Sequence, residues 1–229
     1  MKYVEGSKRV FLTTGTRFPR EVIWAVGAIK YSAAKSNVEL GLLDKEIGRV
    51  VQAKAKELMK GTHDEMVQVD VFQTGSGTGL NMNANEVIAE LASAELGKKV
   101  HPNDHVNMSQ SSNDVGPTAI RVAAAIAVSR NLLPALDNMV NSLTALSKKT
   151  SKVYKAGRTH LRDALPVTMG QEFGAFADEF SRDAELVEKT MRFMFELPIG
   201  GTAVGTGLNA DPKFGIGRAS CRERVSCCV

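Results

Sequence analysis

Apolar residues recur at helical spacing over most of the chain. This period predicts three helices in the first half, over Pro19 to about Ser36, Leu43 to Met59, and from Asn83–Asn85 to Leu96. A glycine follows the second and the third of them at a position typical of a C-cap. Val67–Phe72 alternates between apolar and polar residues, which predicts a short strand or an extended segment.

Two longer helical patterns fill the second half. One runs from Asn113 to about Lys149, with Asn113 or Asp114 as the expected N-cap and a kink rather than an end at Pro134. The other runs from Pro166 to about Leu197. Two helices of this length predict an extended helical bundle rather than a compact globule.

Three polar segments interrupt the apolar pattern, and they are Gln73–Glu86, His101–Asp114 and Gly157–Pro166. Each is rich in hydrogen-bonding side chains, and each leads into a predicted helix. Free backbone N–H groups and the positive end of the helix dipole favour anions at helix N-termini. The segments therefore predict a binding site for a small anionic substrate.

The distance between two of these segments also predicts oligomerisation. A helix from Asn113 to about Lys149 is roughly 50 Å long at about 1.5 Å per residue. One polar segment lies at its start and the next lies just beyond its end. If both belong to one active site, residues from different subunits must meet there, so we expect an obligate oligomer.

The composition argues against several classes of protein. With 43% hydrophobic and 24% charged residues, the 229-residue chain is typical of a globular protein. It has no basic stripe and few aromatic residues, so we expect no nucleic-acid partner. We also expect no membrane partner and a cytoplasmic location, because the chain has neither a long apolar run nor a signal peptide. A mitochondrial form with its transit peptide removed would look similar.

All three cysteines lie in the last nine residues, as Cys221, Cys227 and Cys228. Their spacing fits neither a zinc site nor a CxxC redox pair. One back-translation of Ile216–Val225 resembles a common sequencing-adapter sequence, so we expect 216–229 to be a non-native tail. This tail supplies +2 of the formal net charge of +4. Resequencing the source DNA beyond the Gly215 codon would test this hypothesis.

The first polar segment contains a glycine-rich turn. Gly75, Gly77 and Gly79 alternate with Ser76 and Thr78, an arrangement that would expose backbone N–H groups beside two hydroxyls. An ordinary loop is an equally good interpretation of this turn alone. The spacing is not that of a phosphate-binding P-loop.

The other two polar segments also permit more than one interpretation. Ser111–Asn113 precedes a long helix and could serve only to cap it. His101 and His105 could suggest a metal site, but their spacing falls in a turn rather than on a helix, so we expect no metal. His160 lies in a polar loop, where a lone histidine is more often a surface residue, yet its near-neutral pKa suits proton transfer.

Together, these segments resemble the class II fumarases of the fumarase/aspartase superfamily. The matching stretches, in order, are QTGSGTGLNMNANEVIAELA, VHPNDHVNMSQSSNDVGPTAIRVAAA, GRTHLRDALPVTMGQEF and GGTAVGTGLNADPKF. The resemblance implies a mainly α fold with a helical N-terminal domain (1–112) and an incomplete long-helix bundle (113–215). The full-length protein would assemble as a homotetramer, with active sites shared among three subunits. The implied reaction is the reversible hydration of fumarate to L-malate, with proton removal beside a carboxylate and no cofactor.

The resemblance also implies roles for individual residues. His160 would be the proton donor or acceptor, at a position where aspartases usually carry glutamine. The substrate carboxylates would be bound by Ser76, Gly77, Thr78, Ser111, Ser112, Asn113 and Thr159. A secondary anion site would be formed by His101, Pro102, Asn103 and Asp104.

The sequence also departs from the family pattern. It lacks the later signature GSSxMPxKxNP, which bears the catalytic serine and a substrate-binding lysine, so we expect this polypeptide to be inactive by itself. Aspartase or another dicarboxylate lyase is the alternative activity. A non-catalytic protein that keeps the superfamily scaffold is the alternative from another class, and the retention of His160 speaks against it.

Overall fold

The computed structural model describes residues 1–11, 13–72 and 76–215. Gly75 of the glycine-rich turn and the expected tail, 216–229, lie outside these ranges. The chain forms two compact units, one made of Met1–Ile126 with the segment from Met194 onward, and the other of Ala127–Phe193. The predicted domains, 1–112 and 113–215, divide the chain at other positions and stay a prediction about its organisation.

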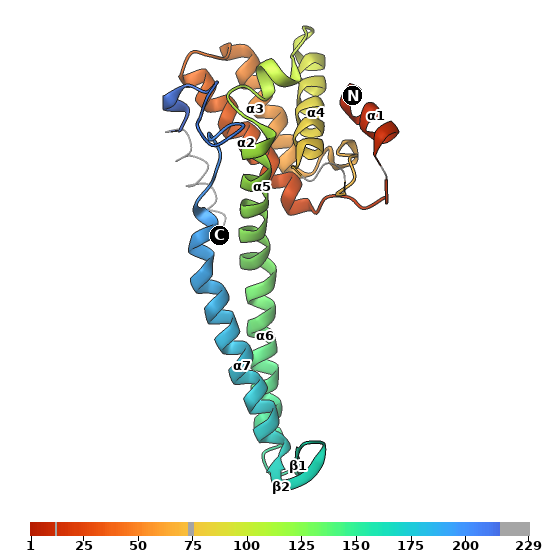
Figure 1. The fold of residues 1–229 in the computed structure, drawn as a ribbon, viewed down its shortest axis with the longest axis vertical. Coiled ribbons are helices and arrows are strands. Elements are labelled where there is room, and N and C mark those ends of the chain that lie inside the picture. Colours follow the sequence, from red (N-terminus) through yellow and green to blue (C-terminus); the bar gives the residue numbers. More distant parts are fainter. Residues whose placement is uncertain (12, 73–75, 216–229) are drawn as a thin grey trace. The chain divides into compact units, whose positions relative to one another are not determined.

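The first unit is built from helices (Figure 1). Most residues of α2 (Arg20–Glu39) are buried, and α3 (Lys45–Lys60) packs against this helix. Their close approach depends on glycine, because a Cβ atom at Gly27 would lie 2.9 Å from the Met59 side chain, and one at Gly48 would overlap Val38. The elements are α1 (Lys2–Val10), α2 (Arg20–Glu39), α3 (Lys45–Lys60), η1 (Asp64–Met66), α4 (Thr78–Leu96), η2 (Pro102–Val106), α5 (Ser112–Ala127) and η5 (Pro212–Gly215).

The helices of this unit begin and end for identifiable reasons. Gly61 and Gly97 follow α3 and α4 in the left-handed region, with φ of 86° and 63°, which confirms both predicted C-caps. Asp44 caps α3 by accepting hydrogen bonds from the N–H groups of Glu46 and Ile47. Helix α1 was not among the predicted helices.

One predicted boundary in this unit was wrong, and so was one of the two alternatives given for Val67–Phe72. The helix expected to start at Asn83–Asn85 begins at Thr78, because Gly77 adopts a left-handed conformation (φ 73°) and acts as its N-cap. The strand suggested at Val67–Phe72 does not form. The N–H groups of Gln68 and Val69 donate instead to the Asn83 side-chain oxygen, so a side chain replaces the partner strand.

The second unit consists of two helices and a β-hairpin. Its elements are η3 (Val128–Leu132), α6 (Leu133–Lys149), β1 (Tyr154–Thr159), β2 (Arg162–Thr168), α7 (Met169–Thr190) and η4 (Met191–Phe195). Helical structure is continuous over Ser112–Lys149 and therefore passes Pro134, as predicted, with a π-turn (η3) just before that proline. By length and composition this helix could cross a membrane. Core helices of soluble proteins meet the same criterion.

The hairpin corrects the prediction of a helix from Pro166 to Leu197. Pro166 lies in β2, beside a register irregularity in β1 between Ala156 and Arg158. Helix α7 begins only at Met169, because Thr168 forms a capping box with Gln171. The helical period of the sequence extends into residues that the hairpin uses for strand pairing.

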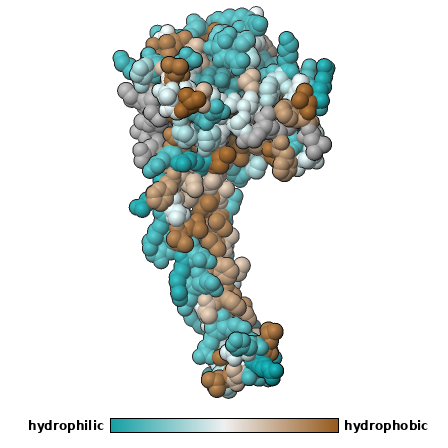
Figure 2. All heavy atoms as spheres, viewed as in Figure 1, coloured by the Kyte–Doolittle hydropathy of each residue, from teal (hydrophilic) through white to brown (hydrophobic). Residues whose placement is uncertain are grey.

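Helices α6 and α7 pack along each other and leave apolar side chains uncovered (Figures 1 and 2). Gly170 permits the close contact, since a Cβ atom there would lie 2.5 Å from the Ser147 carbonyl oxygen. Exposed apolar residues of this kind are typical of a helix surface that other helices cover in a bundle. They include Leu132, Met139, Leu146, Phe176 and Leu186.

We expect Gly170→Ala to destabilise the chain by about 1–3 kcal/mol, because the added methyl group meets backbone atoms that cannot move aside easily. This is opposite to the usual effect of replacing glycine by alanine in a helix. Gly174→Ala is the matched control, since its Cβ would lie 3.1 Å from the rotatable Ser147 hydroxyl. Urea unfolding of both variants measures the difference, and equal stability of the two would contradict the packing argument.

Candidate active site

The turn before α4 meets the start of α5. The Ser76 and Thr78 hydroxyl oxygens lie 2.9 Å apart on either side of Gly77. On α5, a Cβ atom at Gly116 would lie 3.1 Å from the Ser76 carbonyl oxygen, so only glycine allows this contact at ordinary spacing. The first and second polar segments, which are separate in the sequence, are thereby brought together.

A cleft of about 530 Å³ opens at this junction. Its polar lining comes from both segments, through Ser76, Gly77 and Asn113. No described residue along the cleft carries an ionisable side chain. The remaining lining is mostly apolar and comes from Phe18, Val22, Val71, Leu80, Gly116, Pro117 and Ile120. The cleft therefore offers hydroxyl and amide groups in apolar surroundings, beside the N-termini of α4 and α5.

Ser111 is the residue that caps α5, and this corrects the prediction of Asn113 or Asp114. Its Oγ accepts a hydrogen bond from the Asn113 N–H (3.2 Å), and Asp114 Oδ1 accepts one from the Ser111 N–H (2.9 Å). Asp114, at the third helical position, accepts from the cap N–H as in a capping box, while the Ser111 hydroxyl caps the N–H of the second position. The capping interpretation of Ser111 is thus confirmed.

Asp114 also holds a second loop against the start of α5. Its side chain is only 2% exposed, and its Oδ2 accepts hydrogen bonds from the N–H groups of Gly200 (3.0 Å) and Thr202 (2.8 Å). Asn113 adds a hydrogen bond from its side-chain nitrogen to the Ala203 carbonyl oxygen (2.8 Å). The fourth sequence stretch that resembles the fumarases is therefore tied to the second.

A buried lysine beneath these segments was missed by the sequence analysis. Lys30 on α2 is fully buried, and its Nζ donates to Asn81 Oδ1 (2.6 Å), Asn107 Oδ1 (2.9 Å) and Gln110 Oε1 (2.9 Å). Asn81 in turn donates from its side-chain nitrogen to Ser112 Oγ (3.1 Å). One feature of the sequence could have indicated that Lys30 is buried. It lies in the middle of a helix whose other central residues are almost all apolar or small.

Burial lowers the pKa of Lys30 from its ordinary value of 10.5 to about 7, and the negative charge of Asp114 opposes this shift. The dominant effect is loss of solvation, because an ammonium group inside the protein is stripped of water. The three amide oxygens around it are polar but carry no formal charge. The first unit thus contains a positive charge that responds to pH near neutrality.

The proposed secondary anion site is a tightly hydrogen-bonded turn at η2, which starts at Pro102. His101 Nδ1 accepts a hydrogen bond from the Asp104 N–H (3.2 Å) and lies 3.1 Å from Asp104 Oδ2. The His101 N–H donates to His105 Nδ1 (2.9 Å). Asn103 and Asp104 are exposed. Within the described ranges, no group of three or more His, Cys, Asp and Glu residues is placed to hold a metal ion.

The third polar segment belongs to the second unit. Thr159 ends β1, Arg162 begins β2, and His160 and Leu161 form the two-residue loop between them. Both loop residues have positive φ, 50° and 62°, and both are exposed, Leu161 at 97%. Hairpin loops of this type usually contain asparagine or glycine, so His160 and Leu161 hold a strained backbone conformation.

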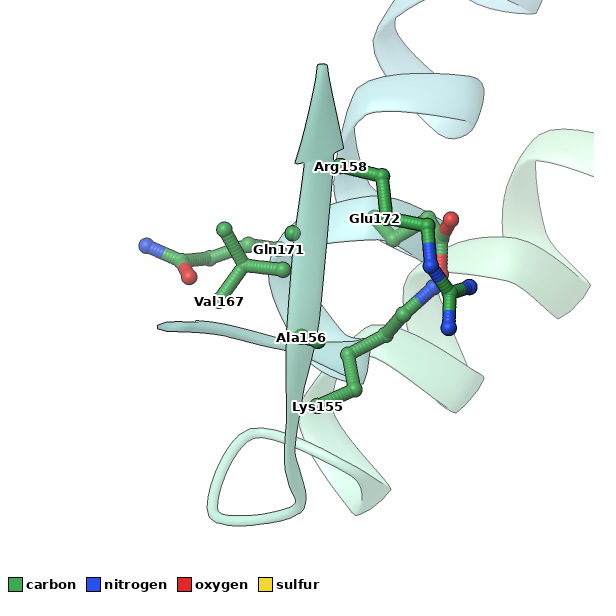
Figure 3. Close-up of a pocket in the computed structure, with 7 residues that line it drawn as sticks. Lys155, Ala156, Arg158, Val167, Gln171 and Glu172 are labelled. Carbon is green, nitrogen blue, oxygen red and sulfur yellow. The ribbon is translucent and has the colours of Figure 1, made fainter. Parts of the chain in front are cut away.

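Ion pairs support the hairpin at its stem. Figure 3 shows Lys155, Arg158 and Glu172 on one side of β1, with Val167 and Gln171 on the other. Lys155 Nζ lies 2.8 Å from Glu172 Oε2, which connects β1 to α7 beside a cavity of about 450 Å³. Arg158 pairs with Asp163 across the two strands, at 3.1 Å. These contacts fix the base of the loop that carries His160.

Known proteins match this chain over nearly its whole length. A family model described as Lyase matches residues 7–220. The class II fumarate hydratase of Saccharolobus solfataricus is 55% identical over 214 residues, which are 93% of this chain and 49% of that protein. A class II fumarate hydratase of Thermus thermophilus is 48% identical over 87% of this chain and 44% of that protein.

Solved structures give the same result. The recombinant class II fumarase of Schistosoma mansoni matches with a TM-score of 0.90 at 32% identity, over 98% of this chain and 48% of that one. The chain therefore belongs to the lyase family. The resemblance to class II fumarases and the mainly α fold of the fumarase/aspartase type are confirmed. The chain spans about half the length of the curated relatives it matches.

We expect the stability of the chain to rise with pH above about 7. Lys30 loses its proton near pH 7 in the folded state but near its ordinary pKa of 10.5 when unfolded. Between these values the unfolded chain binds more protons, so a higher pH favours folding, by up to about 1.4 kcal/mol per pH unit.

Urea unfolding between pH 6 and 9 measures this effect. Lys30→Met should remove the increment, whereas Lys35→Met, at a partly exposed lysine of the same helix, should retain it. A wild-type stability that differs from that of Lys30→Met by the same amount at every pH would contradict the shifted pKa.

We expect Leu161→Gly to stabilise the second unit by up to about 1 kcal/mol, because glycine adopts positive φ without a Cβ clash. Leu165→Gly is the matched control, since Leu165 is also an exposed leucine of the hairpin, at 77%, but lies in β2. That variant should be neutral or destabilised. Hydrogen exchange of the hairpin amides measures both variants, and slower exchange in Leu165→Gly than in Leu161→Gly would refute the strain argument.

Proposed function

We propose that this chain contributes to a fumarate hydratase, which reversibly hydrates fumarate to L-malate. The observation that carries the proposal is the junction of the Ser76–Thr78 turn with the start of α5 at one cleft. Two helix N-termini with neighbouring hydroxyl and amide groups suit a carboxylate. The identity to class II fumarate hydratases supports this choice of substrate.

Fumarate hydration requires hydrogen-bond donors around the substrate, because the reaction creates extra negative charge on a carboxylate. Removing the proton beside a carboxylate spreads extra charge onto that carboxylate, and fixed hydrogen-bond donors stabilise it most in the transition state. We assign the binding of the substrate carboxylates to Thr159 in the second unit and, in the first unit, to Ser76, Gly77, Thr78, Ser111, Ser112 and Asn113. The apolar part of the cleft lining would strengthen these interactions by excluding water.

Proton transfer is assigned to His160. An imidazole can both accept and donate a proton, and the exposed position of His160 on a hairpin loop leaves it accessible to a ligand or to another subunit. We further propose that the active sites are shared between subunits of a homotetramer, that no cofactor takes part, and that the enzyme is cytoplasmic. The uncovered apolar residues along α6 and α7 support the assembly.

The test is fumarate hydration by this chain mixed with the complementary C-terminal half of a related class II fumarase. We expect the absorbance of fumarate to fall with the mixture and to stay constant with the chain alone. His160→Asn should lower the rate by about 10²–10⁴-fold, because a positioned general acid or base contributes that much.

Aspartate is the control substrate in the same mixture. Ammonia release from aspartate without fumarate hydration would favour the aspartase alternative. A mixture that assembles into tetramers but converts neither substrate would favour a non-catalytic scaffold. Full activity of His160→Asn would reject the proton-transfer role of that residue while leaving the substrate assignment intact.

A further inference from the structure

Lys30 is surrounded by neutral oxygen atoms rather than by a carboxylate. Its three hydrogen bonds, to Asn81, Asn107 and Gln110, use all three protons of an ammonium group. Asp114 is the acidic group that acts on its charge, and the Asp114 carboxylate is already occupied by the N–H groups of Ser111, Gly200 and Thr202. Among the described residues, the positive charge of Lys30 is therefore not neutralised by a direct ion pair.

The ammonium group determines how the Asn81 amide is oriented. A protonated lysine can only donate, so Asn81 must turn its side-chain oxygen toward Lys30. The amide nitrogen then points away and donates to Ser112 Oγ (3.1 Å) and Asn107 Oδ1 (3.2 Å). Because Ser112 Oγ accepts from Asn81, the hydroxyl proton of Ser112 is directed away from Asn81.

We propose that Lys30 is a positioning residue that, through Asn81, holds the Ser112 hydroxyl as a donor to a ligand carboxylate. This inference rests on the proposed function, since it takes the dicarboxylate site as given. The three groups donate in one direction, from Lys30 to Asn81, from Asn81 to Ser112 and from Ser112 to the anion. Such chains of hydrogen bonds polarise one another, so the buried charge acts on the ligand without touching it.

Asn81→Asp tests the direction of this chain. The substitution keeps the shape of the side chain and places a carboxylate 2.6 Å from Lys30, so an ion pair replaces the hydrogen bond and the fold is retained. A carboxylate has no proton to give, so Ser112 must donate inward to it and is lost as a donor to the ligand.

Asn107→Asp is the matched control. This substitution places a carboxylate of the same charge 2.9 Å from Lys30, but Asn107 has no hydrogen bond to Ser112 among the described contacts. With succinate as a non-reacting probe at pH 6, where Lys30 is protonated, calorimetry measures the affinity of the mixed complex. We expect a loss of about tenfold or more for Asn81→Asp and of no more than about threefold for Asn107→Asp.

Ser112→Ala shows whether the effect passes through the hydroxyl. In that background Asn81→Asp should cause little further loss of affinity, because the donor it redirects is already absent. Lys30→Met frees the Asn81 amide to rotate, so its loss of succinate affinity should also be smaller in the Ser112→Ala background. This variant replaces Asn81→Asp in the test if Asn81→Asp does not fold.

Equal losses in Asn81→Asp and Asn107→Asp would overturn the inference. An undiminished loss in the Ser112→Ala background would do the same. A complex of unmodified chains that neither binds succinate nor hydrates fumarate would instead overturn the proposed function, and the inference with it. Retained fumarate hydration with equal losses in the two aspartate variants would leave the function standing and reject only the role of Lys30.

Discussion

The hydrogen bonds of the buried Lys30 side chain organise the polar interior of the first unit. An isolated charge inside a protein is costly, so its surroundings must supply hydrogen bonds that leave little freedom. Asn81, Asn107 and Gln110 supply them from α4 and from the loop before α5. One lysine on α2 thereby fixes the two polar segments that meet at the cleft, and the hydroxyl of Ser112 is oriented as a consequence.

Close backbone contacts hold the same polar segments together. Gly116 lets α5 approach the Ser76–Gly77 turn, and Gly77 starts α4 in a conformation that other residues adopt only with strain. Asp114 then joins the loop at Gly200–Thr202 to the same place. Charge burial, glycine contacts and capping therefore act on one short region, which places polar residues of two sequence segments together at the N-termini of α4 and α5.

The sequence predicted α2, α3 and the continuous helix over Ser112–Lys149 well because their apolar period is long, and glycine marks the ends of α3 and α4. It predicted the hairpin at 154–168 poorly, since a two-residue loop of His160 and Leu161 has none of the asparagine or glycine that normally signals one. The polar segments indicated three residues that line the cleft, Ser76, Gly77 and Asn113, and the roles of the other predicted site residues stay a prediction. The segments could not indicate Lys30, because a single lysine in an apolar helix is recognised as buried only once its partners on other elements are known.

The two units contribute different chemistry. The described lining of the cleft in the first unit has hydroxyl and amide groups but no side chain that titrates near neutral pH. The residue suited to proton transfer, His160, lies on an exposed loop of the second unit whose backbone is strained. Strain of this kind persists only where surrounding contacts compensate for it, and the ion pairs of Lys155 and Arg158 support only the stem. Contacts from another subunit would stabilise the strained loop itself. A shared active site is therefore consistent with the backbone conformation of this loop as well as with the length of the helix over Ser112–Lys149.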